Sequence, residues 1–92
     1  MSRISELLQQ PGTVVVDVRT PGEYIGGHYN NSVNIPLNEL TNRLDDFKQM
    51  PGIIVCCASG VRSQKASLIL KQNSIECTDG GSWLDINKHL NN

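Results

Sequence analysis

The residues best suited to chemistry lie between positions 55 and 63, in the segment VCCASGVRS. Cys57 follows a run of β-branched residues, and a short loop then leads directly into a helical pattern. A turn between a strand and a helix directs backbone N–H groups inward, where they form a site for negative charge. The sulfur of Cys57 is the expected occupant. The spacing therefore predicts an anion-binding loop with a nucleophile at its base.

A cysteine attacks sulfur as the thiolate, and the helix start and loop amides are expected to lower its pKa. The loop supplies the candidate substrate-binding residues Ala58, Ser59, Gly60, Val61, Arg62 and Ser63. Gly60 permits a tight curl of the backbone. Arg62 is the one full positive charge of the loop, and two roles are open for it. It either orients an anionic donor or braces the loop by pairing with Asp17 or Glu23.

Further polar residues follow other predicted strands. Asp17 and Arg19 lie where a β-branched run ends, and Gly80-Gly81 follows a later strand. Ligands of open α/β sheets bind at the carboxyl ends of the strands. We therefore expect these segments to meet Cys57 at one edge of the sheet, with Asp17 and Arg19 as supporting residues.

Apolar periodicity and turn signals place the elements that must position these residues. Thr20 and Glu23 form a capping box that starts a short helix closed by Gly26-Gly27. Strands that alternate with helices indicate an α/β fold, a small parallel sheet flanked by helices on both faces. The expected strands are residues 13–18, 33–35, 53–57 and 75–78, a flexible turn covers 79–81, and the other helices are residues 4–8, 38–48, 63–73 and a last one from 83.

The chain has 92 residues, a formal net charge of -1 and 38% hydrophobic residues, which predicts one domain over residues 1–92 with a modest core. The sequence contains no run of lysine or arginine, so binding to nucleic acid or to an anionic membrane is not expected. No apolar stretch reaches the length of a membrane span. No signal peptide is recognised. The three cysteines lack metal-ligand spacing, so neither metal nor cofactor is expected. Their odd number favours a reduced, cytoplasmic protein with one working thiol.

Other chemically capable side chains are assigned structural roles. Cys56 points to the opposite face of its strand from Cys57, and we interpret it and Cys77 as core residues. Arg19 and Glu23 are candidates for an ion pair beside the site. His28 is interpreted as a structural histidine and His89 as a surface residue.

Four ordered motifs together resemble those of rhodanese domains. They are the segment 17–24 (DVRTPGEY) followed by GH at 27–28, the segment 33–36 (VNIP), the segment 57–63 (CASGVRS), and the segment 80–83 (GGSW). The resemblance implies a small parallel sheet flanked by helices and sulfurtransferase chemistry. In that chemistry a donor such as thiosulfate loads a persulfide on Cys57, and a thiol or cyanide accepts the sulfur. Related cell-cycle phosphatases have one residue more between cysteine and arginine, so the shorter loop favours sulfur over phosphate.

The chain also departs from the family pattern. Tyr29 to Ser32 stand where the family usually has glycine and alanine, which predicts a locally altered turn. There is no room for the opening strand of many members, so one sheet edge is expected to be short or bare. Two other functions stay open. One is a carrier that takes sulfur from a protein partner, and the other is a thiol-redox or arsenate-reducing domain with Cys56 or Cys77 as a second thiol.

Overall fold

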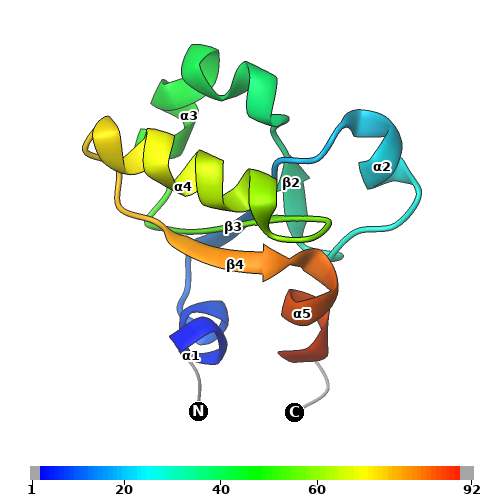
Figure 1. Cartoon of the computed structure of the whole chain (residues 1–92). Helices are drawn as coiled ribbons and strands as arrows, with labels where there is room; N and C mark the ends of the chain where they lie inside the picture. Colours follow the sequence, from blue (N-terminus) through cyan, green and yellow to red (C-terminus); the bar gives the residue numbers. More distant parts are fainter. Residues whose placement is uncertain (1–2, 90–92) are drawn as a thin grey trace.

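A computed structural model, which describes residues 3–89, contains one four-stranded parallel sheet with strand order β2-β1-β3-β4 (Figure 1). The predicted α/β fold class is confirmed. The elements are α1 (Arg3–Gln9), β1 (Thr13–Asp17), α2 (Pro21–Ile25), β2 (Ser32–Asn34), the 3-10 helix η1 (Leu37–Arg43), α3 (Leu44–Lys48), β3 (Gly52–Cys57), α4 (Val61–Gln72), β4 (Thr78–Ser82) and α5 (Trp83–Lys88).

Helices cover both faces of the sheet. Helices α1 and α5 pack on one face, while α4, with η1 and α3 beside it, packs on the other (Figure 1). Every residue of β3 after Gly52 is therefore buried, and alternate side chains enter different cores. Val55 and Cys57 belong to the core under α4, and Ile54 and Cys56 belong to the core under α1 and α5. The two adjacent cysteines thus point to opposite faces, as predicted.

The strand register brings the predicted segments to one edge of the sheet. Asp17 at the end of β1 lies opposite Cys56, and Cys57 at the end of β3 lies opposite Ser82 in β4. Since all strands are parallel, their carboxyl ends share this edge. The outer strands are β4 and the three-residue β2.

The last strand was predicted in the wrong place. β4 begins at Thr78 and runs through Gly80 and Gly81, which were assigned to a flexible turn. A Cβ at Gly80 would lie 2.5 Å from Ile86 Cδ1 and 2.8 Å from Ile54 Cγ2, so only glycine lets the strand approach α5 and β3 this closely. β4 also holds one residue more than β3 between their paired positions. Gly81, with φ of 73°, takes the left-handed conformation that such bulges use.

The predicted helix over residues 38–48 is two shorter helices. Leu37 and Leu40 are three residues apart, and side chains with that spacing align in a 3-10 helix. Leu40 is fully buried and Leu37 packs against the same core, so η1 directs both into it. Arg43 then leaves helical geometry, with φ of -125° and ψ of 24°, before α3 buries Phe47.

Local signals are otherwise reproduced with small shifts in boundaries. The capping box of α2 is confirmed, because Thr20 Oγ1 accepts a hydrogen bond from Glu23 N and a Glu23 carboxylate oxygen accepts one from Thr20 N. Residues 29–32 form a turn in which Ser32 N donates to the carbonyl of Tyr29, whose side chain is buried. His89 is not a plain surface residue, since its Nδ1 lies 2.7 Å from Ser5 Oγ.

The last two residues, Asn91-Asn92, which the sequence predicts to be a frayed end, lie outside the described residues. Within residues 3–89, every helix is too short or too polar to cross a bilayer.

Candidate active site

Cys57 lies at the carboxyl end of β3, at the base of the loop that leads into α4. Its side chain is fully buried, and the backbone N–H of Gly60 donates to its sulfur over 2.9 Å. Gly60 is the residue before the first turn of α4 and has φ of 104°, a left-handed conformation that favours glycine. This curl turns the amide at the helix start toward the sulfur, which is the arrangement the sequence predicts.

The surroundings of Cys57 favour its thiolate. Burial raises the pKa of this thiol, but hydrogen bonds from the amide and hydroxyl of Ser63 and from the amides of Gly60 and Ser59 outweigh burial. The net pKa is therefore lowered. The Ser63 hydroxyl also lies 3.0 Å from the carbonyl of Gly60, and its single proton serves either that carbonyl or the sulfur.

The pKa of each of the other two cysteines is raised. Burial, followed by the charge of Asp17, raises the pKa of Cys56 to about 12. Burial also raises the pKa of Cys77. At neutral pH both are thiols, so Cys57 is the only thiol of the described residues whose pKa is lowered.

Asp17 and Arg19 form a buried ion pair beside the loop. Arg19 Nε lies 2.9 Å and 3.0 Å from the two carboxylate oxygens of Asp17, and Nη2 lies 2.7 Å from Oδ2. Arg19 Nη2 also donates to the carbonyl of Gly27, and its guanidinium lies 5.0 Å from the ring centroid of Trp83. The pair thereby joins the end of β1 to the loop after α2 and to the start of α5.

This geometry corrects one expected pairing. Arg19 does not form an ion pair with the Glu23 carboxylate and contacts only the Glu23 carbonyl, at 3.4 Å. Asp17 takes the guanidinium instead, because both residues lie at the end of the same strand and share its buried edge. Neither the stacking of Trp83 nor the contact with Gly27 was predicted, since no spacing in the sequence indicates them.

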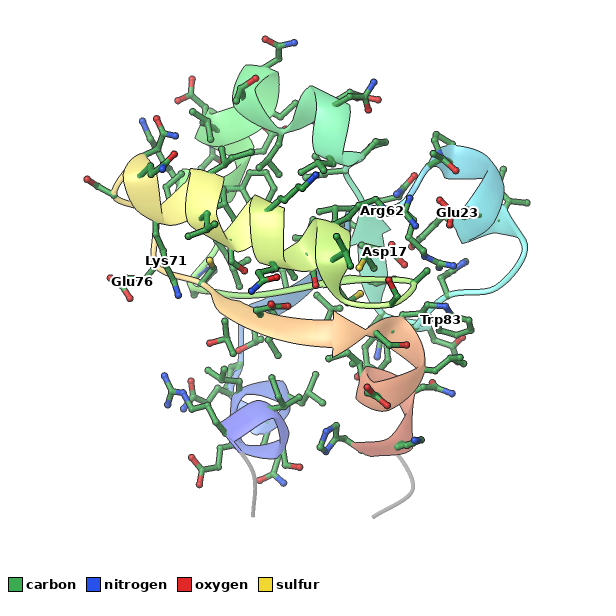
Figure 2. The ribbon with its side chains drawn as sticks, in the orientation of Figure 1. Asp17, Glu23, Arg62, Lys71, Glu76 and Trp83 are labelled. Atoms are coloured by element: carbon green, nitrogen blue, oxygen red, sulfur yellow. The ribbon has the colours of Figure 1, made fainter. Side chains whose placement is uncertain are left out.

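Glu23 binds Arg62. The two carboxylate oxygens lie 2.6 Å and 2.9 Å from Nη1 and Nη2, and both side chains are about one-third exposed. The sequence left Asp17 and Glu23 open as partners of Arg62, and in the structure Arg62 pairs with Glu23. The Arg62 guanidinium, followed by the backbone and hydroxyl of Thr20, lowers the pKa of Glu23 to about 2. Figure 2 shows Arg62, Glu23, Asp17 and Trp83 together at the carboxyl end of the sheet.

An open, mostly apolar groove runs beside Arg62. Its volume is about 380 Å³. It lies between the end of β1, the start of η1 and the start of α4, and it is lined by Val18, Thr20, Pro36, Leu37, Asn38 and Arg62.

The remaining predicted loop residues occupy different positions. Ala58 and Val61 are exposed, whereas Ser63 is buried against the sulfur site. His28 is structural: its Nδ1 lies 2.7 Å from the Tyr24 carbonyl and its ring stacks on Tyr24. No cluster of three or more metal-ligating side chains occurs within residues 3–89.

Comparisons with known proteins agree on one family. The family model described as "Rhodanese-like domain" matches residues 1–84. The protein YqhL of Bacillus subtilis, called uncharacterized, is 35% identical over 65 residues, which are 71% of this chain and 50% of that protein. A tRNA uridine(34) hydroxylase of Salmonella newport is 32% identical over 76 residues, which are 76% of this chain but 22% of the enzyme. The chain thus spans half or less of these curated relatives.

A solved structure shows the same architecture. The rhodanese-like domain protein of Staphylococcus aureus superposes with a TM-score of 0.77 and 29% identity, and the match covers 89% of this chain and 80% of that one.

Proposed function

Because the chain belongs to the rhodanese-like domain family, we propose that it is a sulfurtransferase that carries sulfur as a persulfide on Cys57. The observation that carries the proposal is the contact between the Gly60 amide and the Cys57 sulfur at 2.9 Å. The same curl that places this amide also makes it the first N–H of α4. A negative charge on the sulfur is therefore held by fixed backbone dipoles.

The proposed reaction has two displacements. The Cys57 thiolate attacks the outer sulfur of thiosulfate or a similar donor, a new S–S bond forms, and sulfite leaves with the electron pair of the broken S–S bond. An acceptor thiolate or cyanide then attacks the terminal persulfide sulfur, and Cys57 leaves as the thiolate. The Cys57 thiolate and the persulfide intermediate are both anions at the loop, so the amides of Ser59, Gly60 and Ser63 stabilise the site throughout.

A donor reaches the sulfur only if the loop yields, because Cys57 has no exposed surface. The residues that cover it are small or exposed: Ala58 and Ser59 are exposed, and Val61 is 59% exposed. Opening this loop uncovers little apolar core, so the movement requires little free energy.

Intact-mass measurement after treatment with thiosulfate tests the proposal. We expect an adduct of about 32 Da, the mass of one sulfur atom, that maps to Cys57 and disappears when cyanide is added. Cys57→Ser abolishes it, whereas Cys56→Ser and Cys77→Ser keep it. A folded protein that gains no sulfur at Cys57 from any sulfane donor contradicts the proposal.

A sulfur-carrier role is the second candidate, and the exposure of the loop mouth favours it. Val61 is 59% exposed beside a loop without bulky side chains, so a protein surface has room to approach. Loading of Cys57 by a protein persulfide, with negligible turnover of small donors, would establish the carrier role. Either role fits a reducing compartment such as the cytoplasm, where the thiols stay reduced.

The thiol-redox candidate has less support. Cys56 points to the other face of the sheet, and Cys77 precedes Thr78, which pairs with Ile54. At about 3.3 Å per residue, that register separates Cys77 from Cys57 by roughly 13 Å along the strand. Neither thiol is within reach of the Cys57 sulfur for a disulfide without rearrangement of the sheet.

A further inference from the structure

Two arginines lie beside the Cys57 loop, and a carboxylate neutralises each of them. Arg19 is bound by Asp17, and Arg62 is bound by Glu23 through both of its terminal nitrogens. The loop residues between Cys57 and Arg62 are uncharged. An anionic donor therefore meets backbone dipoles at the loop but no unbalanced cation within it.

Arg62 is the cation that Glu23 neutralises, and it lies five residues after Cys57, at the end of the loop. Glu23 accounts for most of the raised pKa of Arg62, and the Cys57 charge contributes to it as well. Arg62 is the second residue of α4 and lies beside the mouth of the loop, where a donor would approach. Glu23 sets how much of that positive charge a donor experiences.

We propose that Glu23 is a specificity-determining residue that makes the site favour singly charged organic sulfane donors over the thiosulfate dianion. The proposal rests on the function proposed above and names its substrate class. Donors of this class are organic persulfides and thiosulfonates. For a thiosulfonate, the Cys57 thiolate takes the outer sulfur, the S–S bond of the donor breaks, and the sulfinate leaves with the electron pair.

The groove beside Arg62 fits the same class of donor. Its volume of about 380 Å³ is bordered mainly by apolar surface, and Arg62 is its one charged lining residue. An organic substituent gains burial against the apolar lining, whereas the sulfonate end of thiosulfate would meet only one cation there, which Glu23 already neutralises.

The experiment compares two donors in wild type and in Glu23→Gln. Thiosulfate and methanethiosulfonate carry the same outer sulfur and similar size but differ by one negative charge. Glutamine keeps the capping box with Thr20, so α2 is expected to remain folded. The readout is kcat/KM for each donor, with cyanide as acceptor and Cys57 loading followed by mass.

Removal of the Glu23 charge leaves the Arg62 cation unpaired at the mouth of the loop. This cation should raise kcat/KM for methanethiosulfonate by a factor f of about two or three. A dianion feels twice the interaction energy, so kcat/KM for thiosulfate should rise by the square of f, roughly four- to ninefold. The gain should shrink in high salt, because the mouth is open to solvent. Glu39→Gln is the matched control, since it makes the same charge change beside Arg43 in η1, and both donors should keep their wild-type rates.

Equal factors for the two donors, or an equal gain in the Glu39→Gln control, would overturn the specificity role and leave the sulfurtransferase proposal intact. A second measurement uses wild type alone, where thiosulfate kcat/KM should stay flat or rise from about 20 mM to about 200 mM ionic strength, because the Cys57 thiolate repels the dianion and both arginines are paired. A steep fall over that range would show an unpaired cation and overturn the proposal. Absence of a Cys57 adduct with both donors would instead refute the proposed function, and the specificity role with it.

Discussion

Replacement of Gly80 by alanine measures how tightly β4 packs on its neighbours. The added Cβ would lie 2.5 Å from Ile86 Cδ1, 2.8 Å from Ile54 Cγ2 and 3.2 Å from the Val55 carbonyl oxygen. The first two distances are shorter than real contacts of a Cβ, and both atoms belong to the core under α1 and α5. Alanine therefore requires β4 to move, or the fully buried side chains of Ile54 and Ile86 to shift within that core.

We expect Gly80→Ala to lower the free energy of unfolding by about 3 kcal/mol, the upper end for overpacking in a well-packed core. In a protein of this size such a loss lowers Tm by more than about 10 °C. Urea unfolding followed by circular dichroism, with the midpoint and slope fitted separately, gives the free energy of unfolding.

Two other glycines separate packing from backbone strain. Gly81→Ala meets no atom within 4 Å but keeps φ of 73°, so it should cost about 1–2 kcal/mol from conformation alone. Gly22→Ala in α2 meets no atom within 4 Å and has no such φ, so it should be neutral or stabilise by up to about 1 kcal/mol. If Gly80→Ala is no more destabilising than Gly22→Ala, the close approach of β4 to α5 is wrong.

Three further outcomes are expected. Alkylation of Cys57 by iodoacetamide should follow a pH midpoint below the ordinary value of about 8.5, and Ser63→Ala should move that midpoint upward; an unchanged midpoint would exclude the Ser63 hydroxyl from the sulfur site. Asp17→Ala should cost about 3–5 kcal/mol in urea unfolding, because it leaves the Arg19 cation buried and unpaired; a loss below about 1 kcal/mol would contradict a buried pair. The pKa of Glu23 is lowered, so the stabilisation that wild type gains over Glu23→Gln should be constant above about pH 5 and disappear as pH falls through about 2; a difference that persists at lower pH would not come from the charge.

The sequence predicted correctly those features that depend on interactions between residues close together in the chain. The capping box of Thr20 and Glu23 and the glycine before α4 both act within four residues, and the structure contains each of them. The meeting of the strands' carboxyl ends at one edge followed from the predicted parallel sheet. These features depend on few residues at a time.

The errors have long-range causes. Gly80 and Gly81 resemble a turn until Ile86 and Ile54, distant in the chain, occupy the space a side chain would need. The break at Arg43 depends on how η1 and α3 each reach the core. At the site, the sequence left two partners open for Arg62, and only the fold distinguishes Glu23 from Asp17, which is already saturated by Arg19.

The core under α1 and α5 has a consequence for synthesis of the protein. It joins Leu7 near the start of the chain to Ile86 near its end, with Ile54 between them. During vectorial translation this half of the interior lacks Ile86 until α5 has been synthesised. We therefore expect the sheet face that α1 and α5 cover to stay partly exposed in a nascent chain until α5 emerges from the ribosome. The nascent chain should be most prone to aggregation during that time.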